Sequence, residues 1–293
     1  GDSSAIPTTL VSAFAKKHVK VSLSADGGDE LFGGYGKYFG YGNKLNQLVN
    51  LPKPLRKVMS GISAPLVQGV QNPTYQGKID ALQALLTSEE EGQYKLEPRI
   101  FGQKALRDLL VNKAVRPASY FDDFKRLGKN VNGLNRMLAV DYKTYMIDDI
   151  LTKVDRATMS VSLEGREPLL DHRLAEFLAR LPGSVKTLDQ IGKGLLKRIV
   201  HNYVPRELME RPKKGFGVPL VHWFQEDLKD YFEEYLSEKR IREMGIFNAR
   251  YISELKQFYY SRKDQKSEHA ELAFTRLWYL LCFEMWREKW GFD

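Results

Sequence analysis

A single strand-like segment constrains the fold of this chain more than any other feature. Residues Val19 to Ser24 read V-K-V-S-L-S, which alternates apolar and polar side chains and includes β-branched residues. That pattern is typical of a half-buried β-strand. One strand cannot form a sheet, because its backbone donors and acceptors need a partner strand. The partner lies either elsewhere in this chain or in polypeptide outside it, and we expect the second.

The remainder of the chain is predicted to be mainly α-helical. An amphipathic helix is expected from about Ser4 to Lys17, directly before the strand, and apolar residues recur at helical spacing from about Leu45 onward. Prolines mark the expected breaks, at Pro52, Pro54, Pro73, Pro98, Pro117, Pro168, Pro182, Pro205, Pro212 and Pro219. Neither a repeat nor a linker divides the sequence, so 1–293 is interpreted as one unit.

Composition indicates a folded protein that does not cross a membrane. Hydrophobic residues make up 43% of the 293 residues, which is enough for a substantial core. The chain starts at Gly1 without an initiator Met or a signal peptide, so we expect it to be trimmed and not secreted. The only cysteine is Cys282, which stands among apolar residues. We expect a buried, inert thiol and a cytoplasmic location.

The net charge of +8 favours polyanions as partners and leaves their kind open. Basic residues are concentrated between Lys186 and Lys214, where they outnumber the acidic ones. This segment is interpreted either as an ordinary solvated face or as a surface for phosphate or nucleic acid.

An acidic, glycine-rich turn follows the predicted strand directly. Ser24 to Tyr35 read S-A-D-G-G-D-E-L-F-G-G-Y, with three acids and four glycines. Ligands bind at the carboxyl ends of strands in α/β folds, glycines let backbone N–H groups approach an anion, and acids there can hold magnesium. The turn therefore indicates a nucleotide and metal corner, although Asp26 or Asp29 could equally cap the next helix.

Two further segments carry charges in a suggestive pattern. Asp148 to Asp171 mix charged and apolar residues, which predicts buried ion pairs with an architectural role, with Arg166 and Asp171 as the best candidate pair. Lys193 to Arg198 and the loop from Arg211 to Leu220 offer cationic donors suited to phosphate oxygens. The second of these is interpreted as a mobile lid or as an ordinary surface loop.

The order of these three segments resembles the synthetase domain of glutamine-dependent asparagine synthetases and their bacterial paralogues. The resemblance covers essentially the whole chain and is carried by Val21 to Tyr35, Asp148 to Asp171 and Lys193 to Leu220. It implies the carboxy-terminal part of an α/β, Rossmann-like ATP-pyrophosphatase domain. It also implies an ATP- and Mg²⁺-dependent ligase in which a carboxylate attacks the α-phosphate of ATP and ammonia displaces AMP.

The resemblance also assigns residues to roles. Ser24, Ala25 and Gly27 match positions whose backbone lies near ATP, Asp26 matches an acid needed for the acyl-adenylate, and Asp29 matches a magnesium ligand. Lys213 matches a lysine that neutralises charge on the α-phosphate, and Lys193 is a second phosphate-binding candidate. The charged residues of the middle segment match positions interpreted as architectural, namely Asp155, Arg156, Glu164, Arg166 and Asp171.

Two departures from the family pattern limit the resemblance. Family members that make asparagine usually show Ser-Gly-Glu-Gly-Ser-Asp-Glu at the first segment, whereas this chain has S-A-D-G-G-D-E. The acceptor is therefore aspartate or another small carboxylate such as a sugar acid. The pyrophosphate loop Ser-Gly-Gly-x-Asp-Ser and the glutaminase domain that would supply ammonia do not occur in these residues.

We accordingly expect a fragment that is inactive alone and binds ATP weakly, from a protein that could form a homodimer. The competing interpretation outside this class is a basic helical protein that binds nucleic acid without catalysis. The acids of the glycine-rich turn argue against nucleic-acid binding, because they would repel a phosphate backbone. Nucleic acid and membrane are therefore not expected as partners.

Overall fold

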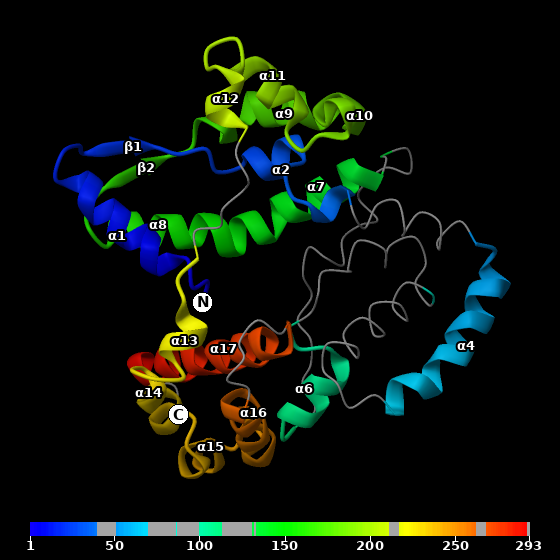
Figure 1. The fold of residues 1–293 in the computed structure, drawn as a ribbon, viewed down its shortest axis with the longest axis vertical. Helices are drawn as coiled ribbons and strands as arrows, with labels where there is room; N and C mark the ends of the chain where they lie inside the picture. The colour runs from blue at the N-terminus through cyan, green and yellow to red at the C-terminus, as the bar shows by residue number, and fades with distance from the viewer. Residues whose placement is uncertain are drawn as a thin grey trace.

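The computed structural model describes residues 1–39, 51–69, 86, 100–112, 131, 133–210, 217–261 and 268–291. Helices form most of this part of the chain, as predicted, and a small parallel sheet joins a segment from the beginning of the sequence to one from its middle (Figure 1). No helix among these residues is long and apolar enough to cross a membrane.

The sheet has two strands in the described part of the chain. Strand β1 (Val21–Leu23) pairs in parallel with β2 (Glu164–Arg166), with Val21 opposite Glu164 and Leu23 opposite Arg166. The expectation that the predicted strand finds its partner outside the chain was therefore wrong for this edge. The sequence did not reveal β2, because Glu-Gly-Arg lacks the alternation of apolar and polar side chains that marks a half-buried strand.

Helix α1 (Ala5–Lys16) confirms the predicted amino-terminal helix, and it packs on α8 (Thr152–Met159). Lys153 Nζ lies 3.0 Å from Asp2 Oδ2 and 3.0 Å from Ser4 Oγ, at the start of both helices. At their other ends, Lys16 Nζ donates to the carbonyl of Ser162. Side-chain bonds at both ends therefore hold the two helices in parallel beside the sheet.

A long helical rod supports the sheet and the corner behind it. It consists of α7 (Gly133–Lys143), a π-helical segment η4 (Met146–Leu151) and α8, which follow one another with almost no break (Figure 1). A π-helical turn holds one extra residue and shifts the side chains that follow it around the helix axis. Asp149 in this segment is half-buried, and burial raises the pKa of its carboxyl.

A small apolar core lies under the glycine-rich corner. Helix α2 (Gly28–Phe32) buries Leu31 and Phe32 against Leu178 of α9 (His172–Arg180). The short helix η5 (Pro168–Leu170) and α11 (Gly194–Val200) add Leu169, Leu170, Leu195 and Leu196 to this core.

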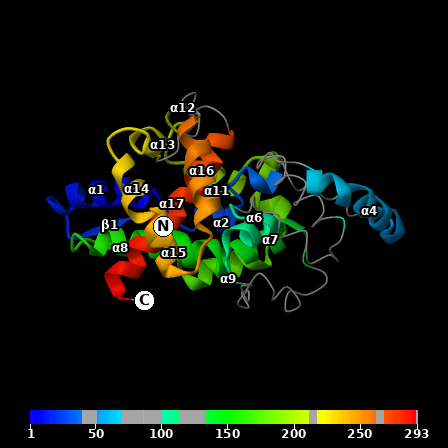
Figure 2. The same cartoon turned by 90° about the horizontal axis from the view of Figure 1, so that it is seen from below.

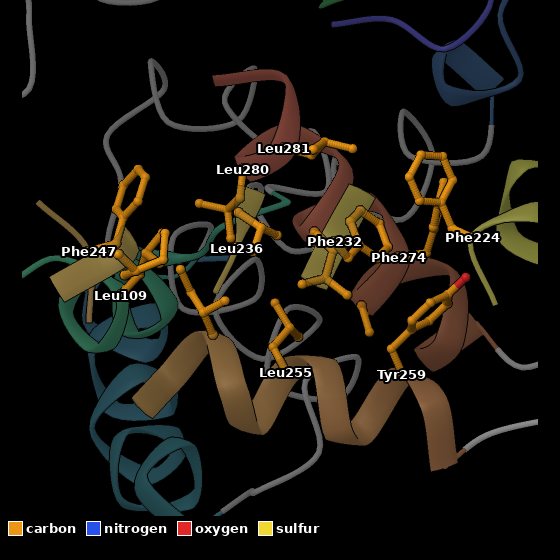
Figure 3. Close-up of a cluster of buried hydrophobic side chains, with 14 of the residues drawn as sticks. Leu109, Phe224, Phe232, Leu236, Phe247, Leu255, Tyr259, Phe274, Leu280 and Leu281 are labelled. Atoms are coloured by element: carbon orange, nitrogen blue, oxygen red, sulfur yellow. The ribbon is translucent and has the colours of Figure 1, made fainter. Parts of the chain in front are cut away.

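A larger core fills the carboxy-terminal half. Its buried residues come mainly from α14 (Lys229–Tyr235), α15 (Glu238–Met244), α16 (Ala249–Ser261) and α17 (Glu268–Trp290). Phe232, Phe274 and Tyr259 stack together in it, and Leu109 of α6 (Gln103–Leu109) closes its other end (Figure 3). The apolar stretch near the chain's end thus lies in the centre of this core and faces other helices.

The two halves meet at the amino terminus. Trp278 Nε1 of α17 donates to the carbonyl of Gly1 at 2.6 Å. Cys282 lies beside Gly1 and is half-buried, less than predicted, and burial raises the pKa of its thiol. Helix α4 (Lys53–Gly69) lies at the opposite end of the molecule from the sheet (Figures 1 and 2).

Several predicted breaks stand at helix starts, because proline fixes φ and has no N–H to leave unpaired there. Pro182 and Pro205 directly precede helices, as does Pro219, while Pro168 opens η5. The helices that they introduce are α10 (Gly183–Lys186), α12 (Arg206–Met209) and α13 (Leu220–Trp223), and η6 (Leu188–Gln190) follows α10. Pro73, Pro98, Pro117 and Pro212 lie outside the described residues.

One buried cation stands out in the middle of the chain. Lys186 on α10 is only 3% exposed, and its Nζ donates to Asn135 Oδ1 on α7 at 2.9 Å. Burial lowers the pKa of this amino group to about 8. The charged form of Lys186 therefore costs the folded state free energy at neutral pH.

We predict that this cost is relieved as the pH rises. The unfolded lysine has a pKa near 10.5, so above pH 8 the unfolded chain keeps a proton that the folded chain releases, and stability rises with pH. The free energy of unfolding should increase by about 1 kcal/mol between pH 8 and 9.5, relative to Lys186→Met, which lacks this titration. Urea unfolding of both proteins at several pH values measures it, and parallel curves would contradict it.

Candidate active site

The candidate site begins where β1 ends. Ser24 N donates to Arg166 O at 2.9 Å, which is the last bond of the parallel ladder. Ser24 Oγ then donates to Asp26 Oδ2 at 2.7 Å and accepts from Asp26 N at 3.3 Å. The predicted residues Ser24 to Gly27 thus form one compact turn at the carboxyl end of a parallel strand, the place where α/β proteins bind ligands.

Glycine is required at position 27 for two reasons. Gly27 has φ +86°, a left-handed conformation that side chains with a Cβ adopt only at a cost. A Cβ there would also lie 2.2 Å from Leu170 Cδ2, well inside van der Waals contact. The turn therefore packs its backbone directly on η5, at the end of the neighbouring strand.

The structure brings two predicted site residues together from distant parts of the sequence. Lys193 Nζ lies 2.9 Å from Asp29 Oδ2, although 164 positions separate the two residues. Lys193 has a left-handed backbone (φ 58°), and its N–H contacts the carbonyl of Gly33 at 3.4 Å. A carboxylate and an ammonium group, each partly exposed, therefore face each other beside the glycine-rich turn.

A third acid, Glu167, was missed by the sequence analysis. It follows β2 directly, and because the carboxyl ends of parallel strands share one edge of a sheet, it comes close to Asp26. Burial raises the pKa of Glu167, and the negative charge of Asp26 raises it further. The signal that could have identified Glu167 was the parallel pairing of its strand, which the sequence did not show.

The predicted pair of Arg166 and Asp171 is wrong. Arg166 Nε binds Glu164 Oε1 at 2.8 Å, whereas Asp171 binds Arg173 at 2.8 Å and accepts from Arg173 N at the start of α9. Helix capping and short sequence separation favour these partners over a more distant one. Hydrogen bonds from Arg173 lower the pKa of Asp171.

The interpretation of the ion pairs as buried fails for three pairs of this segment, whereas Lys153 and its partner Asp2 are partly buried. The side chains of both new pairs are more than one-third exposed, and Arg156 with Asp155, at 3.5 Å, is exposed as well. Exposed pairs of this kind contribute little to stability. The segment's architectural role therefore rests on its backbone pairing in β2, on the packing of α8, and on the bonds of Lys153 to Asp2 and Ser4.

The predicted lid residue Lys213 and its neighbour Lys214 lie outside the described residues, as does most of the loop that carries them. The other lysine predicted to bind phosphate, Lys193, lies within the described residues and pairs with Asp29. No cluster of three metal-ligating acids, histidines or cysteines occurs among the described residues. Because magnesium is commonly held by one or two carboxylates together with substrate phosphates, the hard oxygen donors of Asp29 suit the metal only alongside a nucleotide.

The structure places an acid and a cation in contact at the carboxyl edge of a parallel sheet, the edge at which α/β proteins bind ligands. The sequence profile of the asparagine synthase family matches residues 1–288. The chain belongs to this family.

Individual relatives agree with this assignment. Over 289 residues the chain is 30% identical to the glutamine-hydrolyzing asparagine synthetase 1 of Bacillus subtilis, which covers 97% of the chain and 43% of the relative. It is 33% identical to a Mycobacterium bovis protein provisionally assigned the same activity, over 97% of the chain and 42% of the relative. A match to the rat asparagine synthetase has 31% identity over 41% of the chain and 22% of the relative. The chain thus spans less than half the length of these relatives.

The requirement for Gly27 gives a paired prediction. Gly27→Ala should lower the free energy of unfolding by roughly 2–4 kcal/mol, because it combines left-handed strain with a clash on Leu170. Gly245 has φ +68° with open space around it, so Gly245→Ala should show only the strain, about 1–2 kcal/mol. Thermal melting of both variants measures the difference, and equal losses would show that the turn does not pack on η5 as described.

Proposed function

We propose that this chain is the synthetase part of a longer, ATP-dependent amide-forming ligase of the asparagine synthase type. In the proposed reaction, a carboxylate oxygen of the acceptor attacks the α-phosphorus of ATP, the bond to the β-phosphate bridge breaks, and pyrophosphate leaves. Ammonia then attacks the acyl carbon of the adenylate, AMP leaves with the bonding electron pair, and the nitrogen releases one proton to solvent to give the amide. Family membership together with the contact between Asp29 and Lys193 at the carboxyl end of β1 carries this proposal.

The proposed work of this chain is to bind and orient ATP and the acceptor. The backbone of Ser24, Ala25 and Gly27 would approach the nucleotide, which the left-handed turn at Gly27 supports. Lys193 would donate to a phosphate oxygen once it leaves Asp29. Asp26, held by Ser24 Oγ, is the acid proposed to act in adenylate formation.

Asp29 is the residue proposed to hold Mg²⁺. A bound magnesium ion would neutralise part of the charge on the ATP phosphates. Asp29 Oδ2 lies 2.9 Å from Lys193 Nζ, so this carboxylate faces a cation. That orientation supports the assignment, because a metal ligand is also a carboxylate that faces a positive charge.

We propose aspartate as the acceptor, with ammonia released from glutamine by a part of the protein outside this chain. The names of the relatives, which include glutamine hydrolysis, support the nitrogen source. One observation favours a second candidate, a sugar acid or other small carboxylate. Ala25 and Asp26 stand where asparagine-forming relatives usually have glycine and glutamate, and both changes alter the space beside the adenylate.

We also propose that β1 continues a larger Rossmann-like sheet. Lys20 O and Ser24 N are used by β2, so the N–H and C=O groups of Val21 and Leu23 point to the other edge, which has no partner among the described residues. Leu23 is 71% exposed, and Leu10 and Phe14 of α1 are similarly exposed. An apolar edge of this kind favours a further parallel strand from polypeptide outside this chain.

The proposed function is tested by pyrophosphate exchange in the full-length protein. We expect labelled pyrophosphate to enter ATP only when aspartate is present, because exchange reports reversible adenylate formation. Asp29→Asn should abolish the exchange by weakening magnesium binding. Exchange with glucuronate in place of aspartate would select the second candidate. If the folded wild-type protein shows no pyrophosphate exchange with any small carboxylate that is tested, the proposal is contradicted.

The lysines give a separate prediction in the same enzyme. Lys213→Ala should lower kcat by roughly a hundredfold or more with little change in the KM for ATP, because its charge acts on the transition state. Lys193→Ala should raise the KM for ATP. Lys214→Ala is the matched control and should have a mild effect. Steady-state kinetics separate the three, and loss with Lys214→Ala but not with Lys213→Ala would move the assignment by one residue.

A further inference from the structure

Two adjacent carboxylates on α2 have different partners. Asp29 Oδ2 faces Lys193, whereas Glu30 is only 1% exposed and its Oε1 accepts from Tyr35 Oη at 2.6 Å. Helix α2 has only five residues. A helix this short has little stability of its own, so contacts of its side chains set its orientation.

One tight turn clamps both carboxylates. Gly33 ends α2 with φ +70°, and Gly34 N donates to Asp29 O at 2.9 Å. A Cβ on Gly34 would lie 2.0 Å from Asp29 Oδ1, so the backbone of the turn rests directly on the Asp29 side chain. The next residue, Tyr35, places its hydroxyl on Glu30. The orientation of Asp29 is therefore tied to the position of this turn.

The far end of the turn is anchored on the long helical rod. Lys37 Nζ lies 2.9 Å from Asp141 Oδ2 on α7, and the same oxygen accepts from Tyr38 Oη at 2.5 Å. Lys37 Nζ also lies 5.3 to 5.6 Å from the ring centres of Tyr35, Tyr38 and Tyr145. Cation–π contacts and the ion pair of Lys37 with the buried Asp141 thus fix the residues that follow Tyr35. The hydroxyl of Tyr35 is the link from this anchor back to α2.

We propose that Tyr35 is a positioning residue for Asp29 and so sets the affinity of the site for the magnesium–nucleotide complex. This inference rests on the proposed function, in which Asp29 holds the metal. Loss of the hydroxyl leaves the buried Glu30 carboxylate without this donor, so Glu30 turns toward other donors or water and rotates the first turn of α2 with it. Asp29 then leaves the geometry that Gly34 and Lys193 impose.

Calorimetric titration of the full-length protein with magnesium and α,β-methylene-ATP tests this inference without needing turnover. Tyr35→Phe should weaken binding about tenfold, the size expected for removing a group that orients a metal ligand. The matched control is Tyr259→Phe, which removes a buried hydroxyl bond to Val221 O in the carboxy-terminal core. It should lower the melting temperature but leave binding unchanged, so a general loss of stability is separated from positioning.

A double-mutant cycle completes the test. If Tyr35 acts through Asp29, Tyr35→Phe combined with Asp29→Asn binds no more weakly than Asp29→Asn alone. Additive losses, or normal binding by Tyr35→Phe when Asp29→Asn binds weakly, would overturn the role of Tyr35 only. Normal binding by Asp29→Asn would instead overturn the proposed metal ligand, and with it the premise of this inference.

Discussion

The parallel pairing of β1 with β2 is the interaction on which the candidate site depends. It joins segments that lie far apart in the sequence, with Val21 opposite Glu164 and Leu23 opposite Arg166. Because parallel strands end at the same edge, the turn that begins at Ser24 and the segment that begins at Glu167 come together. The close approach of Gly27 to Leu170 and the electrostatic contact of Asp26 with Glu167 both follow from this alignment.

A second level of organisation is the way in which α2 is held. Leu31 and Phe32 of α2 pack on α9 in a small apolar core. The acids of α2 make polar contacts. Asp29 reaches Lys193, which begins α11, while Glu30 reaches Tyr35. The acid proposed to bind metal is therefore fixed by elements that come from three separate stretches of the chain. Such support is what a site needs if a ligand is to find its donors already oriented.

The carboxy-terminal helices form a second, larger core. This core is rich in aromatic residues, and Trp278 of α17 bonds to Gly1 at the amino terminus. The apolar edge of β1 and the outer face of α1 are a different kind of surface, since their exposed side chains are apolar and lie next to the candidate site. The large buried core and the exposed apolar side chains of β1 and α1 are thus at different places in the fold.

The sequence by itself determined the local features. Alternation and periodicity predicted β1 and α1, and the prolines predicted several helix starts. The glycine-rich turn was also predicted at the end of β1, and ligand binding there stays a prediction. These features depend on neighbouring residues only, which is why they can be read along the chain. Family membership was also determined at this level and is confirmed.

Only the tertiary structure decided the pairings. Three contacts join residues that are distant in the sequence: the pairing of β1 with β2, Asp29 with Lys193, and Glu167 with Asp26. The sequence Glu-Gly-Arg of β2 does not have the pattern that predicts a strand. The pairing predicted for Arg166 and Asp171 was wrong because each of them pairs with a residue two positions away. Arg166 binds Glu164, and Asp171 binds Arg173. A charge in a sequence indicates that a partner is needed, but the geometry of the folded chain determines which one it meets.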